Sequence, residues 1–335
     1  MKSFFKVILT LFLTFSLIFI LEFIFYFVNN QSNKEQIYVL DNNDKIKKIQ
    51  SFGFKLIDPL LGWRMKDNEI REKGFDLNNN IIVLKSTNKC NKKKKILITG
   101  GSTSDVVLNK ENWPIELIEI LDSYGYCIDL HVAAVGGYSS AQELLRLIRD
   151  GLKNDIDLHI SYSGVNEIDM VTYVSRYEHH IFKEVYLKSG RNNLLPNTIY
   201  FIKKKFNLDD SDVELYLEPQ NEPGAFWIQN MKCMNGIAIG NNYKFKGILQ
   251  PVLGIGLHKD EILENEYNSQ TIKYQKYYTQ LIDSVSHYDF IEDFTNIFDT
   301  CTQSVFIDDC HIRKPYQSTI AKNIFKLIQG EGTIN

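Results

Sequence analysis

The chain has 335 residues, of which 44% are hydrophobic and 24% are charged, and its formal net charge is −3 at pH 7. A hydrophobic share of this size predicts a packed globular protein and excludes a chain that is disordered throughout. The charge balance shows no basic excess, which argues against a nucleic-acid-binding protein.

The first element is an apolar segment at residues 7–28, long enough to cross a bilayer core as a helix. Lys2 and Lys6 precede it and the next basic residue is Lys34, so the positive-inside rule places the N-terminus in the cytoplasm and the rest of the chain outside. A cleaved signal peptide is the alternative, but no small-x-small cleavage site follows the segment. We expect residues 1–29 to form an uncleaved anchor.

Residues 30–95 are expected to form a membrane-proximal extension that packs on the main domain. Asp58 and Pro59 interrupt it, and Gly62 with Trp63 indicates a tight turn followed by a strand.

Residues 96–170 contain three strand–turn–helix units, the pattern of a parallel sheet. The first strand, 96–99, runs into Gly100 and Gly101, and Ser102 follows at once. A serine on a glycine turn at the carboxyl end of a parallel strand can face a ligand. Taken alone, this pattern is more often an ordinary turn.

The second unit covers residues 132–140, where a strand meets a glycine turn and a helix begins. Ser139 or Ser140 can cap that helix, and a backbone N–H beside Gly137 could then point at an anion. An ordinary strand-to-helix turn is the alternative.

The third strand, residues 158–163, ends in Gly164, Val165 and Asn166. An Asn at this place can aim its side-chain amide at a developing oxyanion, and a simple Asx-turn is the alternative.

The elements after residue 170 complete the predicted sheet. Residues 171–242 interrupt the pattern as an insertion, which could cover a site at the strand ends. Within it, Phe226 and Trp227 could form an aromatic platform for a sugar or simply pack in the core. We expect a fourth strand over 243–253, a helix over 264–286, a fifth strand within 288–298 and a final amphipathic helix containing Ile320 and Ile324.

A carboxylate and a histidine lie between the fifth strand and the final helix. Asp308 precedes His311 by three residues and can orient its imidazole, which gives nucleophile, acid and base in the order Ser102, Asp308, His311. Asp309 is adjacent, so the choice of Asp308 rests on spacing.

The five cysteines leave their pairing open, because connectivity does not follow from sequence. Cys90 could pair with Cys127, and Cys301 with Cys310, leaving Cys233. The sequence contains no Cys-x-x-Cys motif of the kind that indicates a metal site. We expect neither a metal nor a cofactor.

Together, the four segments resemble the blocks of the SGNH/GDSL hydrolase superfamily, in the family's order. The serine block is Gly100-Gly101-Ser102-Thr103, the glycine block Gly136-Gly137-Tyr138-Ser139, the asparagine block Gly164-Val165-Asn166-Glu167, and the last block runs from Asp308 to His311. The usual Gly-Asp-Ser is here Gly-Gly-Ser, and the usual Asn-Asp is Asn-Glu.

The resemblance implies a flavodoxin-like three-layer α/β/α fold with a parallel five-stranded sheet over residues 96–330. It implies Ser102 as nucleophile, His311 as base and Asp308 as its orienting acid. The implied oxyanion hole consists of the N–H groups of Ser102 and Gly137 and the side chain of Asn166.

Other segments resemble membrane-anchored SGNH proteins of bacterial surface-polysaccharide clusters. These segments are Asp58-Pro59-Leu60-Leu61-Gly62-Trp63-Arg64, Trp113-Pro114 and Leu249-Gln250-Pro251-Val252. We therefore expect a single-pass inner-membrane protein with a periplasmic or other extracytoplasmic domain.

The function expected from these blocks is an esterase acting on ester groups, foremost O-acetyl groups, of a cell-surface or cell-wall glycan. An O-acyltransferase could use the same triad, and a non-catalytic module that binds or organises a glycan is the third hypothesis. The expected partners are the acylated glycan and the inner membrane through residues 7–28, and no nucleic acid.

Overall fold

The computed structural model describes residues 60–170 and 223–330, short stretches at 36–40, 46–50 and 55–58, and residues 16 and 332. The chain divides into two compact units, Met1–Arg64 with Glu178–Glu218, and Met65–Tyr177 with Pro219–Asn335. The predicted anchor at 7–28, apart from Ser16, and residues 171–222 of the predicted insertion lie outside the described residues. Among the helices that are described, none has the length and apolar character needed to cross a bilayer.

The described part of the first unit consists of short antiparallel strands. Strand β1 (Gln36–Leu40) pairs with β2 (Ile46–Gln50), and β3 (Lys55–Asp58) forms a second two-stranded sheet with β4 (Gly62–Met65). The Asp58 carboxylate closes the β3–β4 turn, because it accepts the backbone N–H groups of Leu60 and Leu61 at 3.0 and 2.9 Å. The strand expected after Gly62 is present as β4.

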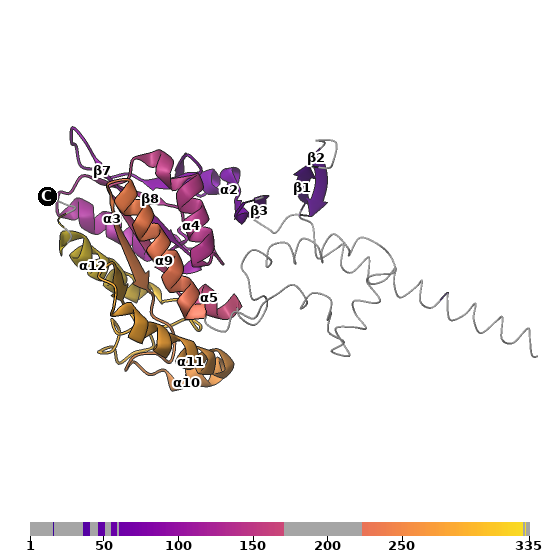
Figure 1. The fold of residues 1–335 in the computed structure, drawn as a ribbon, viewed down its shortest axis with the longest axis vertical. Helices are drawn as coiled ribbons and strands as arrows, with labels where there is room; N and C mark the ends of the chain where they lie inside the picture. The colour runs from indigo at the N-terminus through magenta and orange to yellow at the C-terminus, as the bar shows by residue number, and fades with distance from the viewer. Residues whose placement is uncertain are drawn as a thin grey trace, which may run out of the picture. The chain divides into compact units, whose positions relative to one another are not determined.

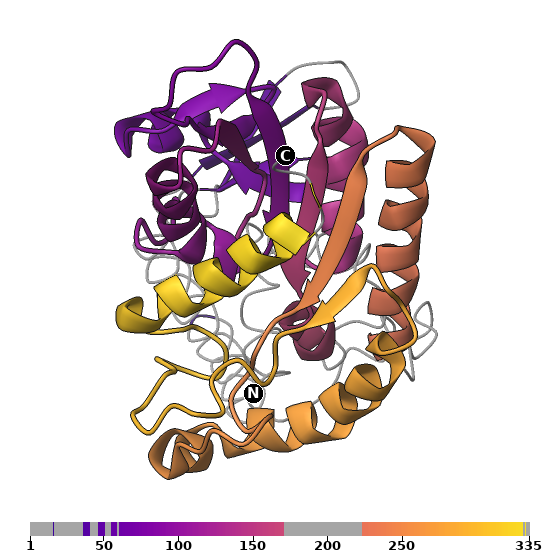
Figure 2. The same ribbon diagram turned by 90° about the vertical axis from the view of Figure 1, so that its left-hand side faces the viewer.

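The second unit is built on a sheet of seven strands in the order β11-β10-β9-β7-β8-β6-β5. Five are parallel: β7 (Lys94–Gly100), β8 (Ile128–Val132), β9 (Leu158–Ser163), β10 (Lys244–Leu249) and β11 (Ile291–Asp293). When these five strands are numbered by their order along the chain, they lie side by side in the order 2-1-3-4-5, as in flavodoxin. Figures 1 and 2 show this sheet with helices around it.

The prediction of a sheet with five strands was wrong, because the sheet contains two further strands, both antiparallel to their neighbours. Strand β6 (Ile81–Leu84) pairs with β8, and β5 (Asp76–Asn78) pairs with β6. The turn between them is Asn79-Asn80, whose φ angles of 48° and 64° are those of a two-residue hairpin turn. Ile81 and Ile82 are buried, so this part of the expected extension belongs to the main sheet.

Helices lie on both faces of the sheet. On one face, α3 (Trp113–Ser123) packs on α12 (Lys314–Gly330). On the other, α9 (Pro223–Gly240) contacts both α4 (Ser140–Arg149) and α11 (Asn268–Val285). The remaining helices are short: α2 (Asp67–Glu72), α5 (Val165–Met170) and α10 (Glu261–Glu266), with 3-10 turns η1 (Ser102–Ser104) and η2 (Gly151–Asn154). The helix expected over 264–286 is thus divided into α10 and α11.

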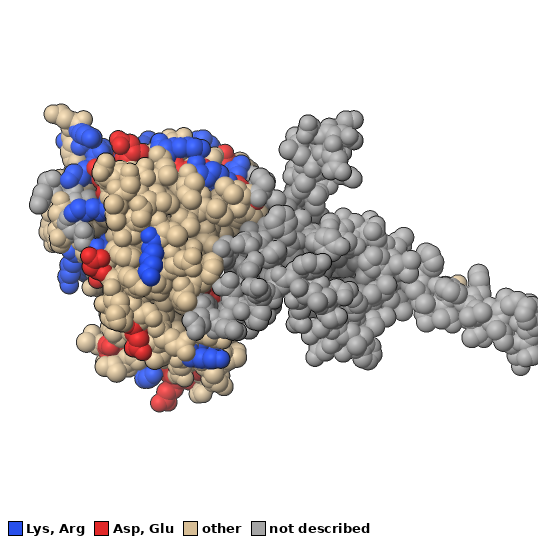
Figure 3. Space-filling model, in the orientation of Figure 1, with Lys and Arg blue, Asp and Glu red and all other residues tan. Residues whose placement is uncertain are grey.

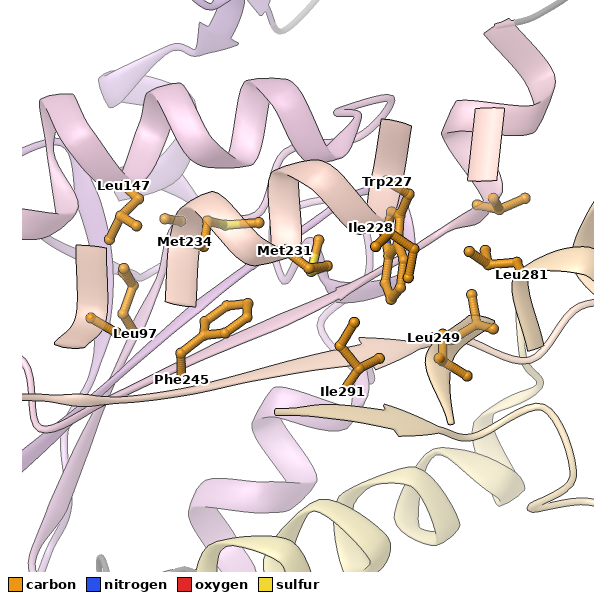
Figure 4. Close-up of a cluster of buried hydrophobic side chains, with 14 of the residues drawn as sticks. Leu97, Leu147, Trp227, Ile228, Met231, Met234, Phe245, Leu249, Leu281 and Ile291 are labelled. Carbon is orange, nitrogen blue, oxygen red and sulfur yellow. The ribbon is translucent and has the colours of Figure 1, made fainter. Parts of the chain in front are cut away.

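Helix α9, the last part of the predicted insertion, covers the sheet with apolar side chains. Trp227 and Met231 face β10, where Phe245 and Leu249 lie (Figure 4). Trp227 is fully buried and its indole N–H donates to Ser163 Oγ at 3.0 Å. Trp227 therefore belongs to the core, which confirms the core-packing alternative for this residue and excludes it as a sugar platform.

One of the two suggested cysteine pairs is present. Cys90 and Cys127, which precede β7 and β8, form a disulfide with Cα atoms 6.3 Å apart. The suggested pairing of Cys301 with Cys310 was wrong, because neither residue is in a disulfide.

Candidate active site

Ser102 lies directly after β7, at the carboxyl edge of the sheet. Its strand is the one at which the strand order reverses, since β8 lies on one side of β7 and β9 on the other. Ligands of open α/β sheets bind at such a switch point. Ser102 begins the 3-10 turn η1, and the backbone N–H of Asp105 donates to the Ser102 carbonyl at 3.3 Å.

The histidine and carboxylate of the last block meet the serine. His311 Nε2 lies 2.8 Å from Ser102 Oγ, and His311 Nδ1 lies 2.7 Å from Asp308 Oδ2. Asp308 Oδ1 also accepts the backbone N–H groups of Cys310 and His311, at 3.0 and 2.7 Å. The loop therefore holds the carboxylate and the imidazole in one geometry.

Asp308, and not its neighbour, faces the imidazole. The Asp309 side chain accepts the Tyr274 hydroxyl at 2.5 Å, and the Asp309 carbonyl accepts the N–H of Leu253 at 2.9 Å. These contacts hold Asp309 toward α11 and the loop after β10.

The contacts between Asp308 and His311 shift both of their pKa values. The hydrogen bond to Asp308 raises the pKa of His311, which burial alone would lower. Burial alone would raise the pKa of Asp308, but the hydrogen bonds from His311 and from two backbone N–H groups lower it. Asp308 is thus an anion at neutral pH, beside an imidazole that binds a proton more readily than usual.

Asn166 reaches the serine turn from the start of α5. A Cβ atom on Gly101 would lie 2.5 Å from Asn166 Nδ2, so only glycine leaves room for this amide. The same Nδ2 donates to the Tyr138 carbonyl at 2.7 Å. The amide therefore lies between the serine block and the glycine block.

The glycine block passes beside Ser102 in a left-handed turn. A Cβ on Gly136 would lie 3.7 Å from Ser102 Cβ, and Gly137 has φ +84°, which favours glycine. The Glu167 carboxylate accepts the N–H of Ser140 on the far side of this turn. In the part of the chain that the structure describes, no hydrogen bond uses the N–H of Ser102 or of Gly137.

The helix after the glycine block begins as expected. Ser139 is the N-cap of α4, and its N–H donates to Gln142 Oε1 at 3.1 Å.

Asp105 joins the serine and glycine blocks, and the sequence analysis did not single it out. Its buried carboxylate accepts the N–H groups of Val107 at 2.9 Å and Leu108 at 3.2 Å through Oδ1, and that of Gly136 at 2.9 Å through Oδ2. The signal in the sequence was an acidic residue in an otherwise uncharged turn directly after the serine block.

A cleft of about 250 Å³ opens over Ser102 and His311. Leu108 and Ile307 give it apolar walls and are themselves partly exposed. Its other lining side chains are mainly amides and short polar groups: Thr103, Asn109, Asn112, Asp308 and Gln317. Basic and acidic side chains are interspersed on the face of the molecule shown in Figure 3.

We expect Gly101→Ala to lower kcat on the order of 10²- to 10³-fold, the loss typical of removing one oxyanion donor. The new methyl group would displace the Asn166 amide from Ser102 while leaving Ser102 and His311 in place. The rate of p-nitrophenyl acetate hydrolysis measures the effect. Gly236→Ala is the matched control, because nothing lies within 4 Å of a Cβ there. Equal rates for both variants would show that the amide is not needed.

No protein-family model matches the sequence, and no curated protein does. Among solved structures, an acetyl xylan esterase is similar at 13% identity and a TM-score of 0.43, over 70% of this chain and 99% of that one. An acetyl-xylooligosaccharide esterase from Geobacillus matches at 13% identity and a TM-score of 0.44, over 70% and 94%. A GDSL-like lipase from Bacteroides thetaiotaomicron matches at 13% identity and a TM-score of 0.40, over 73% of this chain and 92% of that one.

Proposed function

We propose that this chain is a serine-dependent esterase of the SGNH type, with Ser102 as nucleophile, His311 as general base and Asp308 as the orienting acid. One observation carries the proposal: the unbroken contact path from Ser102 Oγ to His311 Nε2 at 2.8 Å and from His311 Nδ1 to Asp308 Oδ2 at 2.7 Å. A hydroxyl, an imidazole and a carboxylate in this order form the arrangement that activates serine for acyl transfer.

The reaction has two halves. Ser102 Oγ attacks the ester carbonyl while His311 Nε2 takes its proton, and collapse of the tetrahedral intermediate passes that proton to the leaving alcohol. Water then attacks the acyl-enzyme, gives a proton to Nε2 and releases the acid, and Nε2 returns the proton to Ser102. Asp308 keeps the Nδ1–H in place throughout and stabilises the imidazolium.

The oxyanion of both intermediates would be held by three donors: the N–H groups of Ser102 and Gly137 and the side chain of Asn166. The two backbone N–H groups have no partner among the described residues, and Nδ2 carries a second N–H besides the one on Tyr138. Each such donor stabilises the transition state by roughly 3 kcal/mol.

The substrate we propose is an O-acetyl group on a surface or cell-wall glycan. The small cleft with apolar walls suits a short acyl group, and the amides beside it suit sugar hydroxyls. The Cys90–Cys127 disulfide supports an oxidising compartment, in keeping with an anchor at residues 7–28 and a domain outside the inner membrane. A chain placed there meets glycans rather than cytoplasmic esters.

The test compares the full chain with Ser102→Ala on p-nitrophenyl acetate and on O-acetylated glycans, with acetate release as the readout. We expect release that Ser102→Ala abolishes, and a free-sugar acceptor would show whether the acyl group passes to water or to a hydroxyl. Equal release by both proteins would contradict the proposal. Ser269→Ala, at a serine exposed on α11, is the control for the substitution itself.

The pH dependence of kcat/KM should follow His311. The base must be neutral to accept the Ser102 proton, and the bond to Asp308 raises the pKa of His311 above 6.5. We therefore expect the rate to rise with pH through a single ionisation above 6.5. A rate that stays constant from pH 5 to 9 would exclude His311 as the base.

A further inference from the structure

The loop that carries Asp308 and His311 offers a third ligand atom of a kind that binds metals. Cys310 Sγ lies 3.6 Å from His311 Nδ1, and the Asp308, Cys310 and His311 ligand atoms all lie within 4.8 Å of one another. Of the residues that the structure describes, only these three form such a group. Because they are nearly consecutive, no Cys-x-x-Cys or spaced His/Cys motif marks them in the sequence.

The separations suit tetrahedral coordination. A zinc ion with ordinary Zn–N and Zn–S bonds holds the two ligand atoms about 3.6 Å apart, which the Nδ1–Sγ pair already meets. The Nδ1–Oδ2 separation of 2.7 Å must widen to roughly 3.4 Å, which a turn of the Asp308 carboxylate supplies.

The cleft reaches two of the three side chains of this group. The Cys310 side chain is buried, whereas the side chains of Asp308 and His311 are 29% and 38% exposed and line the cleft. Asp309 is held by Tyr274 and is not among the ligands. A cation entering the cleft therefore meets the carboxylate and imidazole first and the thiol behind them.

We propose that Asp308, Cys310 and His311 bind a thiophilic divalent cation of the zinc class, and that this binding switches off the esterase. The cation takes the lone pair of His311 Nδ1, so the neutral imidazole must carry its proton on Nε2. An Nε2–H group only donates and cannot accept the Ser102 proton. The thiol proton passes to solvent and the thiolate becomes the third ligand, while the bond between Asp308 and His311 is lost.

The ligand set also fixes which cations act. Thiolate and imidazole favour zinc and cadmium over magnesium and calcium, which prefer oxygen ligands. The inhibition rests on the proposed esterase function, but the binding does not.

The binding arm of the test uses Cd²⁺ as the probe and the ultraviolet thiolate-to-cadmium charge-transfer band as the readout. A chain with Cys233→Ser and Cys301→Ser retains Cys310 as its one thiol outside the disulfide, and it should keep the band at one Cd²⁺ per chain. Adding Cys310→Ser, or Cys310→Ala if the serine variant melts early by circular dichroism, should remove it. A band that persists without Cys310, or no band with it, overturns the site.

The activity arm uses Zn²⁺ and p-nitrophenyl acetate. We expect zinc to inhibit the full chain and a chelator to restore the rate. Cys310→Ser, measured against its own rate without metal, should need at least about tenfold more zinc for half-inhibition. Equal inhibition of both proteins overturns the switch. If neither protein hydrolyses the ester, the esterase proposal fails while the cadmium band still decides the site.

Discussion

Ser102→Ala, His311→Ala and the double variant should each lower kcat by a similar factor, on the order of 10⁶-fold. A serine without its base and a base without its serine are equally unable to start the first step, because the 2.8 Å contact joins them in one proton transfer. Once one of the two residues is missing, replacing the other causes little further loss of rate. Independent roles would instead make the two losses multiply.

The measurement is kcat for p-nitrophenyl acetate on the four proteins of this cycle, at a pH where the unaltered chain is fully active. His287→Ala serves as the control, since His287 is exposed at the end of α11 and away from the cleft. A double variant that is a thousandfold or more slower than either single variant would contradict the assignment.

Glu143→Gln should raise the free energy of unfolding by about 3 kcal/mol at pH 8 and leave it nearly unchanged at pH 4. Glu143 is fully buried in α4, and its Oε2 accepts the hydroxyls of Thr99 at 2.7 Å and Ser161 at 2.6 Å. Burial, with a smaller contribution from the charge of Glu167, raises its pKa from 4.5 to about 7. A glutamine keeps an oxygen for both hydroxyls and never ionises.

The direction follows from which state holds the proton. Below pH 4.5 the side chain of Glu143 is protonated in both states, and its neutral form is stable in the core. Between pH 4.5 and about 7 the unfolded chain loses the proton while the folded chain keeps it, so the free energy of unfolding falls. Above pH 7 the loss is complete.

Denaturant unfolding at pH 4, 6 and 8 measures this difference between the unaltered chain and Glu143→Gln. Glu266→Gln is the matched control, because Glu266 is an exposed residue of α10. Parallel pH dependences for the unaltered chain and Glu143→Gln would show that Glu143 ionises in the core as it does in water.

The parts of the site that the sequence predicted are those with local signals. Each of the three glycine-containing turns follows a short apolar strand, and the strand order then brings Ser102, Gly136 and Asn166 to one edge of the sheet. The apolar run Ile81–Leu84 after the Asn79-Asn80 turn is a strand signal, but the run itself does not show that it pairs with β8, far along the chain, and so joins the main sheet.

The features that the sequence did not predict depend on contacts between residues that are distant in the chain or on the geometry of a loop. Glu143 meets Thr99 and Ser161 only because β7 and β9 are neighbours in the sheet. The pairing of Cys301 with Cys310 failed because closeness in sequence does not fix where two side chains of a loop point. Which of Asp308 and Asp309 faces His311 also depends on the loop geometry, since Tyr274 of α11 holds Asp309.

The most direct test of the central claim is covalent labelling of the full chain with a fluorophosphonate, followed by mass spectrometry of its peptides. We expect one adduct per chain, on the peptide that contains Ser102, and no adduct in Ser102→Ala or, over the same time, in His311→Ala. An adduct on a different serine, or no adduct on a chain that melts cooperatively, would contradict a Ser102 nucleophile activated by His311.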